Sequence, residues 1–395
     1  MSDGVSAWGD NSNGQLGQGD TTGVAAPTPV KGLGTVRKVA AGSGHVVALL
    51  ADGTALSWGR NAFGQLGDGT MNNQLHPVPV KGLAGIKDII PGGGQTLFLL
   101  EDGTVWGAGA GFFGLLGPQN LGLCPVAVQV TDISGVTELT SGGGHALALR
   151  ADGSLWTWGR DDYGQLGDGP NPENVPGRKM MNHSERSYWS RPLPTPVSGV
   201  TGEIAALAAG GGHSTVILKD GTMLSWGDND RGQLGDGTMD HRSSPGPVPG
   251  VTDVVAAACA YHHTLALRQD GTVLAFGIND RGQLGDGTTE HRPSAVPVKG
   301  LADVVAVTCA GGGGEADPGN FGSSMALLRD GTVMAWGCND HGQLGDGGTN
   351  RGRLVPAPVP GLSGIAQITS GGEIPFSREN PGGGYALAVA AASIA

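Results

Sequence analysis

Charged and aromatic residues are scarce in this sequence of 395 residues, at 15% and 5% of the chain. The 35 Asp and Glu outnumber the 23 Lys and Arg, which gives a net charge of −12, and no basic run or basic tail is present. Because nucleic-acid binding takes most of its affinity from Lys and Arg that neutralise phosphates, we expect no DNA or RNA partner.

Long apolar runs are absent too. No stretch approaches the length needed to span a membrane, and the start, MSDGVSAWGD, lacks the charged and apolar regions of a secretory signal. We therefore expect a cytoplasmic protein with no membrane partner. The four cysteines, Cys124, Cys259, Cys309 and Cys338, are too few and too scattered for a disulfide framework.

Helical periodicity is also missing, since no stretch keeps an apolar spacing of three and four residues over a dozen positions. The chain has instead a repeat, marked by the phrase GQLG or a close variant. The phrase begins at Gly14, Gly64, Gly114, Gly164, Gly232, Gly282 and Gly342. The spacings of 50, 50, 50, 68, 50 and 60 residues define a 50-residue unit with two longer intervals. A fixed period of this length predicts a repeat architecture and a single domain over residues 1–395.

Each unit has the pattern of four short strands. In the stretch IKDIIPGGGQTLFLLEDGTVWGAGAGFFGLLG, apolar or alternating runs are separated by Gly clusters and by Asp-Gly, a strong hairpin signal because the turn needs positive φ. The runs predict strands over Ile86–Ile90, Thr96–Leu100 and Thr104–Gly109 and an outer strand over Pro125–Val130. Seven units of four antiparallel strands predict an all-β, seven-bladed β-propeller.

These markers together resemble a known repeat. The unit GGGHALALRADGSLWTWGRDDYGQLGDG, from Gly142 to Gly169, is similar to the repeat of the regulator of chromosome condensation (RCC1-like) family, and the resemblance covers nearly the whole chain. It implies a seven-bladed propeller but selects no function, because one fold hosts many. The family includes an exchange factor for a small GTPase and a plant UV-B photoreceptor. This chain lacks the basic tail of the first and the Trp clusters of the second.

The two ends of the chain share one unit. The sequence begins inside a unit, at VSAWGDNSNGQLG, and stops after GGGYALAVAAASIA, which matches only the second strand of a unit. We predict that Val5–Gly9 pairs beside Ala386–Val389. The last blade is then closed by both termini, so that no sheet edge is left open in the ring.

Two recurring side chains have structural interpretations. The aromatic residue before Gly, at Trp8, Trp58, Trp158, Trp226, Phe276 and Trp336, fits packing between adjacent blades. The position that opens the second strand is held by His45, Gln95, His145, His213, His263, Ser323 and Tyr385. In a propeller this position forms a circle around the channel on one face, and the simplest interpretation is that each His binds nearby backbone.

Metal sites have weak support in the sequence. Asp228, Asp230 and Asp236 imitate the spacing of a calcium loop, but Met239 stands where that loop needs a bidentate Glu. Cys259 and Cys309 occupy the same strand position in neighbouring units, where a metal pair is conceivable. Core filling is favoured there, since free Cys is a common core residue. We expect no metal and no cofactor.

Three insertions break the repeat, over about residues 170–194, 311–322 and 371–384. The alternating strand direction places all three on the same face as the His circle, whereas the Asp-Gly turns lie on the opposite face. Loops that depart from a repeat on one face commonly mark where the repeat protein binds. The insertions are therefore the candidate functional segments.

The residue types in the insertions support two functions. The first is a recognition module for a protein or a peptide, because Trp, Tyr, Phe and Arg are enriched in binding hot spots. Its binding residues would be Arg186, Tyr188, Trp189, Phe321, Phe376, Arg378 and Tyr385. The alternative is an enzyme acting on a small molecule in a pocket that the insertions roof at the channel mouth. Its acid or base would come from His183, Glu185, Glu315, Asp317 and Glu373.

Overall fold

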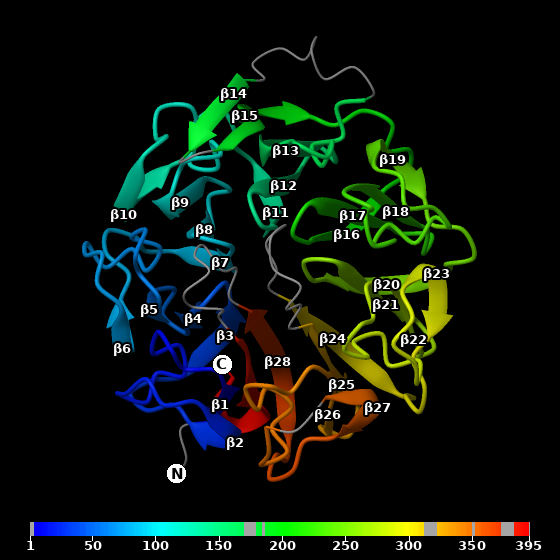
Figure 1. The fold of residues 1–395 in the computed structure, drawn as a ribbon. Coiled ribbons are helices and arrows are strands. Elements are labelled where there is room, and N and C mark those ends of the chain that lie inside the picture. Colours follow the sequence, from blue (N-terminus) through cyan, green and yellow to red (C-terminus); the bar gives the residue numbers. More distant parts are fainter. Residues whose placement is uncertain are drawn as a thin grey trace.

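The fold is a ring of seven β-sheets around a central axis (Figure 1). The computed structural model describes residues 4–169, 179–183, 186–311, 322–349, 352–372 and 383–394, with the backbone alone for 179, 181–183, 186 and 187. In these residues the single helical element is the short 3-10 helix η2 (Ala391–Ser393), and no helix is long and apolar enough to cross a membrane. The all-β, seven-bladed propeller expected from the repeat is confirmed.

Six blades consist of four antiparallel strands, which we denote A to D from the axis outward. The first blade contains β3 (Val36–Ala41), β4 (His45–Leu50), β5 (Ala55–Gly59) and β6 (Gln74–Pro79). The second blade contains β7 (Ile86–Pro91), β8 (Gln95–Leu100), β9 (Val105–Ala110) and β10 (Leu123–Gln129). The expected strands of this unit match these bounds to within two residues at each end.

The later blades follow the same order. The fourth blade contains β16 (Ile204–Ala209), β17 (His213–Leu218), β18 (Met223–Gly227) and β19 (Arg242–Pro247). The fifth contains β20 (Val254–Cys259), β21 (His263–Arg268), β22 (Val273–Gly277) and β23 (Arg292–Pro297). The sixth contains β24 (Val304–Ala310), β25 (Ser323–Leu328), β26 (Val333–Gly337) and β27 (Arg353–Pro358).

The seventh blade is built from both ends of the chain. It contains β28 (Ile365–Gly372), β29 (Gly384–Ala390), β1 (Val5–Gly9) and β2 (Val24–Pro29). β1 pairs antiparallel with β29, with Val5 opposite Val389 and Trp8 opposite Ala386. The predicted closure of the ring by both termini is confirmed.

The third blade departs from the four-strand pattern that the sequence predicts. It contains β11 (Val136–Ser141), β12 (His145–Arg150), β13 (Leu155–Arg160), β15 (Arg186–Pro196) and an additional outer strand, β14 (Lys179–His183). β14 and β15 form an antiparallel hairpin within the first insertion. This part of the insertion lies at the outer rim of the ring in Figure 1, away from the central axis.

Adjacent blades are joined by the recurring tryptophans. Trp8, Trp58, Trp158, Trp226 and Trp336 are fully buried, as is Phe276 at the equivalent position. The indole of Trp58 in the first blade donates a 2.9 Å hydrogen bond to the carbonyl of Gln15, which belongs to the seventh blade. Trp8 donates in the same way to Gln343 of the sixth blade. The expected packing between blades is confirmed.

The long connection from strand C to strand D is stabilised by its own polar residues. In the fourth blade, Asn229 Oδ1 accepts the backbone N–H of Leu234, and Asp236 Oδ1 accepts the backbone N–H of Thr238. Asp236 also pairs with the first residue of the outer strand, Arg242. The equivalent pairs are Asp286 with Arg292, Asp346 with Arg353 and Asp168 with Arg191. The Asp that directly follows the GQLG phrase, at Asp168, Asp236, Asp286 and Asp346, is therefore a structural residue.

Candidate functional site

The propeller has two different faces. We call the face that carries the A–B turns and the C–D loops the loop face, and the one that carries the B–C turns the turn face. On the turn face, each Asp of an Asp-Gly turn accepts the backbone N–H of the Thr or Ser two residues later, at Asp52, Asp102, Asp152, Asp220, Asp270 and Asp330. The turn face thus repeats the same capped turn in six of the seven blades, and in the seventh the two chain ends take its place.

The A–B turns of all seven blades surround a small cavity on the axis. Its volume is about 150 Å³, and its described lining consists of Gly, Ala, Ser, Pro, Cys and Tyr residues without a charged side chain. Cys259 and Cys309 lie side by side in this lining. Burial raises the pKa of the Cys259 thiol to about 11 and holds that of Cys309 well above its ordinary value, so both thiols are neutral. Neutral thiols fit the core-filling interpretation.

The His circle lies inside the blade interfaces, not on a surface. Thr96 Oγ1 donates its proton to the Gln65 carbonyl at 2.7 Å, and His45 Nε2 lies 3.0 Å from Thr96 Oγ1. Because the hydroxyl has only that one proton, the His45 ring must donate its Nε2–H to the hydroxyl oxygen. The relay recurs with His145 and Ser214, His213 and Thr264, and His263 and Ser324. Each of these histidines therefore binds a hydroxyl of the next blade, a contact that the sequence does not predict, and backbone of Ser43 and His213 also interacts with His45 and His145.

Burial lowers the pKa of these four histidines. His45, His145, His213 and His263 are no more than 1% exposed, and the pKa of each falls to about 3. An imidazolium without water or a counter-charge is unfavourable, so the neutral ring is the folded form. The circle therefore stabilises the ring of blades and offers no general base.

Chemically distinctive side chains gather elsewhere on the loop face, between the third and fifth blades. This group, which we call the blade 3–5 cluster, comprises Arg160, Tyr163, Tyr188, Asp228, Asp230, His241, Tyr261 and His262. Tyr261 and His262 stand where most A–B turns have two glycines, as at Gly143 and Gly144. Their rings contact each other at 4.6 Å between centroids. The cluster is where the repeat loses its uniformity.

Arg160 is the centre of the aromatic half of the cluster. Its guanidinium lies over the rings of Tyr188, Tyr163 and Phe113, at 4.8, 5.5 and 5.8 Å from their centroids, and pairs with Asp162. Burial alone would lower the pKa of Arg160, but the Asp162 carboxylate outweighs it and raises the pKa, so the side chain stays charged. Cation–π contacts of this kind hold the insertion against its own blade.

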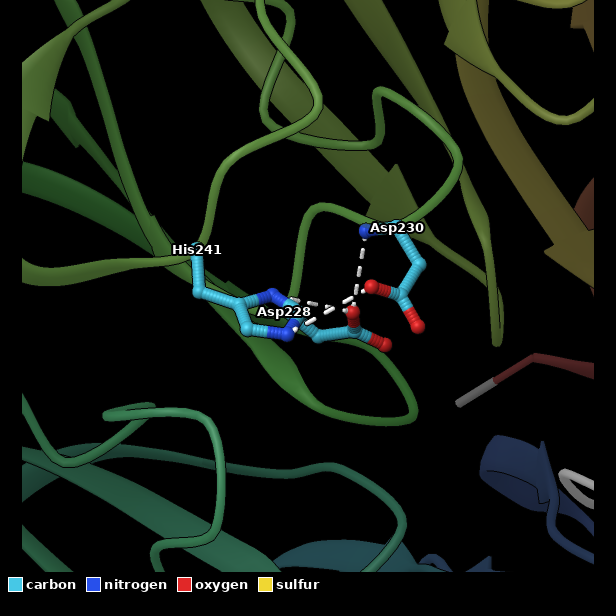
Figure 2. Close-up of side chains that lie close together, drawn as sticks. All are labelled: Asp228, Asp230 and His241. Atoms are coloured by element: carbon cyan, nitrogen blue, oxygen red, sulfur yellow. Dashed lines mark hydrogen bonds and ion pairs between the residues drawn. The ribbon is translucent and has the colours of Figure 1, made fainter.

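The acidic half of the cluster lies on the fourth blade (Figure 2). Arg160 of the third blade is close enough to interact electrostatically with Asp228. Asp228 is 3% exposed, and its Oδ1 accepts the backbone N–H of Asp230 at 3.1 Å. His241 places Nδ1 3.5 Å from Asp228 and Nε2 3.4 Å from Asp230. Burial raises the pKa of Asp228, and the neighbouring Asp230 carboxylate adds to the rise.

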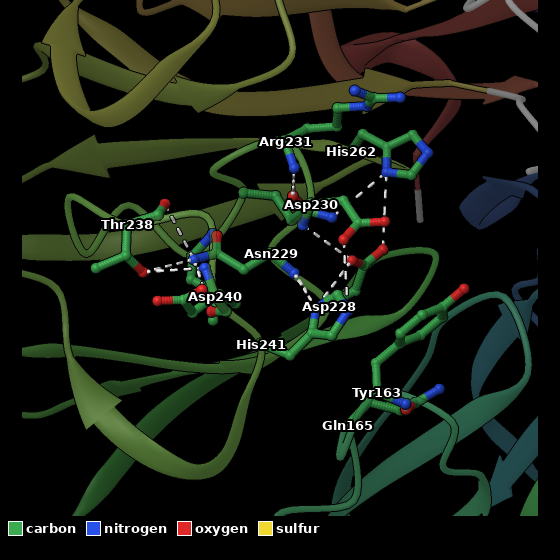
Figure 3. Close-up of polar contacts among 12 residues, drawn as sticks. Tyr163, Gln165, Asp228, Asn229, Asp230, Arg231, Thr238, Asp240, His241 and His262 are labelled. Atoms are coloured by element: carbon green, nitrogen blue, oxygen red, sulfur yellow. Dashed lines mark hydrogen bonds and ion pairs between the residues drawn. The ribbon is translucent and has the colours of Figure 1, made fainter.

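A metal ion does not suit this group, although the ligand atoms of Asp228, Asp230 and His241 are close enough to hold one. Nδ1 of His241 accepts the backbone N–H of Asn229 at 3.0 Å (Figure 3). The neutral ring therefore carries its proton on Nε2, where a metal would need a lone pair. The same bond recurs from Asn279 to His291 and, with an amide acceptor, from Asn61 to Asn73. His241 is thus a loop-closing residue of the repeat.

His262 is oriented in a similar way. Gln233 accepts the Arg231 backbone N–H through Oε1, so its amide nitrogen faces His262 Nδ1 at 3.3 Å. His262 Nδ1 is then an acceptor and lies 3.8 Å from Asp228 Oδ2. The Asp228 carboxylate is consequently bordered by two imidazole nitrogens that accept hydrogen bonds, which makes this corner rich in acceptors.

The structure describes only some of the residues that the sequence analysis proposed for binding or catalysis. Tyr188 and Trp189 are half-buried against their own blade, where the Trp189 backbone N–H donates to Asp162 at 2.7 Å. His183 and Arg186 are paired in the hairpin by their backbone. The remaining nominated residues, Glu185, Glu315, Asp317, Phe321, Glu373, Phe376 and Arg378, lie outside the described residues.

Tyr385 was expected to bind a partner, and this expectation is wrong. Its side chain is fully buried, and its hydroxyl donates to the carbonyls of Gly42 and His45 at 3.0 and 2.7 Å. These bonds join the seventh blade to the first. Tyr385 therefore replaces His at this position as a closing residue of the ring.

Comparison with known proteins gives one family over most of the chain. A family model described as an RCC1-like domain matches residues 5–377. Human E3 ubiquitin-protein ligase HERC2 is 38% identical over 66 residues, which are 16% of this chain. The chain spans only 1% of the length of HERC2.

Solved structures share the whole fold at low sequence identity. Human WBSCR16 superposes with a TM-score of 0.78 at 20% identity, covering 98% of both chains. Prp20p from Saccharomyces cerevisiae gives 0.77 at 22% identity, covering 97% of this chain and 90% of its own. Yeast RCC1 (Prp20) bound to Kap60 gives 0.76 at 20% identity, covering 98% and 88%. At these identities the likeness shows the fold alone.

Proposed function

Because this chain belongs to the RCC1-like family, we propose that it is a module that recognises a protein or a peptide through the loop face of its propeller. Protein partners have precedent on this fold, since Prp20p was studied for its binding to Gsp1p and histones and yeast RCC1 was solved bound to Kap60. Those partners are not transferred to this chain, because the identities are 22% and 20%.

The observation that carries the proposal is the asymmetry between the two faces. The turn face repeats one capped Asp-Gly turn, whereas the loop face collects the charged and aromatic blade 3–5 cluster. Residues that depart from a repeat on one face are expected where a repeat protein contacts its partner. Aromatic and Arg side chains packed beside charged groups are also the composition of interface hot spots.

The chemistry of the cluster indicates what a partner would present. The Asp230 side chain is 58% exposed and that of His241 40%, and both cover the buried Asp228. Asp228 is bordered by imidazole acceptors and Asp230 is an exposed carboxylate, so a Lys or Arg side chain of the partner is the complementary group. The net charge of −12 favours encounter with such a basic segment. Arg186, Tyr188 and Trp189 of the insertion lie within the proposed surface.

The catalytic alternative has less support. The axial cavity of about 150 Å³ is smaller than the roughly 300–1,000 Å³ of ligand pockets, and its described lining has no acid or base. The hairpin of β14 and β15 lies at the rim, so this part of the first insertion does not roof the cavity. Of the acids and bases expected for an enzyme, His183 lies in the hairpin, and Glu185, Glu315, Asp317 and Glu373 lie outside the described residues.

A pair of charge reversals tests the proposal. Asp230→Lys changes the loop face at a side chain that is 58% exposed, and Glu101→Lys makes the same change on the turn face at one that is 59% exposed. Each tagged variant is used to capture partners from a lysate of the source organism, and quantitative mass spectrometry compares the captured proteins with those of the unmodified chain. The matched exposure and charge make Glu101→Lys the control.

We expect Asp230→Lys to lower the recovery of a specific partner at least about tenfold, the effect of losing one favourable charge pair and gaining a repulsive one. Glu101→Lys should leave the recovery unchanged. The opposite result, with loss only for Glu101→Lys, would assign binding to the turn face. Equal recovery for all three chains would remove the blade 3–5 cluster from the binding surface.

A further inference from the structure

The outermost strand of the third blade lacks a feature that the outermost strands of all other blades share. β2, β6, β10, β19, β23 and β27 each contain at least one proline. Proline has no N–H donor, and natural proteins place it on edge strands to prevent further pairing. β14, with the sequence KMMNH, contains no proline.

One edge of β14 has no strand beside it among the described residues. β14 is the last strand in the order of its sheet and pairs only with β15, at the rim of the ring in Figure 1. His183 pairs with Arg186 across a two-residue connection, and the closing pair of such a hairpin exchanges its hydrogen bonds within the pair. Met180 and Asn182 therefore turn their backbone N–H and C=O groups to the open edge.

We propose that this open edge of β14 is a docking edge, on which an extended acidic segment of a partner protein adds as the sixth strand of the third blade. Strand addition takes its affinity from backbone hydrogen bonds and its selectivity from alternate side chains. Met180 offers an apolar contact there, because it is 57% exposed, the highest value among the large hydrophobic residues that the structure describes. The docking edge rests on the proposed function only in requiring a protein partner, since no residue of β14 belongs to the blade 3–5 cluster.

Charge favours an acidic partner over a second copy of this chain. β14 contains Lys179 and no acidic residue. An acidic residue of the added strand would lie opposite Lys179, and cross-strand pairs of opposite charge are stabilising. Two copies paired antiparallel through β14, with Met181 at the centre, would place Lys179 opposite His183 and bring no carboxylate to either.

Synthetic peptides test the docking edge on the full chain. The probe is the fluorescein-labelled peptide Glu-Val-Thr-Val-Thr-Val-Glu, and its binding is followed by fluorescence anisotropy. One control peptide carries N-methyl groups on alternate residues, which removes backbone donors, and another replaces both Glu by Lys. Two protein variants separate backbone from side chain: Met180→Pro removes the outward N–H, and Met180→Ala keeps it.

We expect the acidic probe to bind, with at least about fivefold weaker binding for the N-methylated peptide, since one hydrogen bond is worth about that factor. The Lys peptide should bind more weakly than the acidic one. Met180→Pro should weaken binding of the acidic probe as much as N-methylation of the peptide does, whereas the affinity of Met180→Ala for the probe should stay within about twofold of the unmodified chain. Asp230→Lys should leave the probe's affinity unchanged, so failure of the loop face and failure of the docking edge are distinguishable.

Three results would overturn the docking edge. The first is an acidic probe that does not bind, or an N-methylated or Lys peptide that binds equally well. The second is an equal loss for Met180→Ala and Met180→Pro, which would assign the affinity to the side chain. The third is a dimer in sedimentation analysis that Met180→Pro dissociates, which would make a second copy the occupant of β14.

Discussion

The four buried histidines make the stability of the propeller depend on pH. His45, His145, His213 and His263 each have a pKa of about 3 in the folded chain, against an ordinary value of 6.5. In the unfolded chain each imidazole takes up a proton below pH 6.5, whereas in the folded chain it stays neutral until about pH 3. The unfolded state therefore binds more protons in this window, and the free energy of unfolding must fall as the pH falls.

The size of the effect follows from proton linkage. Between pH 7 and pH 5.5 each histidine lowers the free energy of unfolding by about 1.3 kcal/mol, and the four together by about 5 kcal/mol. The window stays above the ordinary pKa values of Asp and Glu, so carboxylates contribute little to it. A loss of about 5 kcal/mol is a large share of the stability of a typical domain.

Urea denaturation followed by tryptophan fluorescence at pH 7.0 and 5.5 measures the effect. The matched variant replaces the four histidines by Gln, the residue that the second blade uses at this position, where Gln95 donates to Ser141 Oγ. This variant should lose most of the pH dependence, and a single variant such as His145→Gln about a quarter of it. A fall of less than about 1 kcal/mol in the unmodified chain, or an undiminished fall in the Gln variant, would refute the reasoning.

Two further changes test the closure of the ring and the role of the first insertion. Tyr385→Phe removes the hydroxyl that joins the seventh blade to Gly42 and His45 of the first. Thermal unfolding should therefore show a free energy of unfolding lower by about 1–3 kcal/mol, and an unchanged melting temperature would contradict the role of Tyr385 in closing the ring. Replacing residues 170–190 by Thr-Met-Asp-His, the sequence of residues 238–241, keeps Arg191 paired with Asp168 as Arg242 is with Asp236. The shortened chain should unfold cooperatively, with a free energy of unfolding lower by about 1–2 kcal/mol, because it loses a cation–π contact and one or two hydrogen bonds. Non-cooperative unfolding would show instead that the propeller needs the insertion to fold.

The fold was predictable because the repeat carries it. The seven copies of the repeat phrase indicated seven sheets, and the incomplete first and last units indicated the pairing of Val5–Gly9 with the C-terminal strand. The fifth strand of the third blade was not predictable, since KMMNH has neither alternation nor β-branched residues and has no counterpart in other units. Its strand conformation depends on pairing with β15, which is a tertiary effect.

The candidate site was only partly predictable, because its contacts run between blades. His45 and the hydroxyl it binds are 51 residues apart, and Arg160, Asp228 and His262 meet only because their blades are neighbours. A signal for the cluster was nevertheless present. Tyr261 and His262 replace two glycines at a fixed turn position, and this departure from the repeat marks the fifth blade as clearly as the insertions mark the third, sixth and seventh.

The central claim is that partners bind the loop face. Hydrogen exchange of the chain with and without its captured partner measures this directly, because protection reports which backbone amides the partner covers. We predict protection in the C–D loops at residues 160–163 and 228–231 and in the A–B turn at residues 261–262. Protection confined to the Asp-Gly turns at Asp52, Asp102, Asp152, Asp220, Asp270 and Asp330 would contradict it.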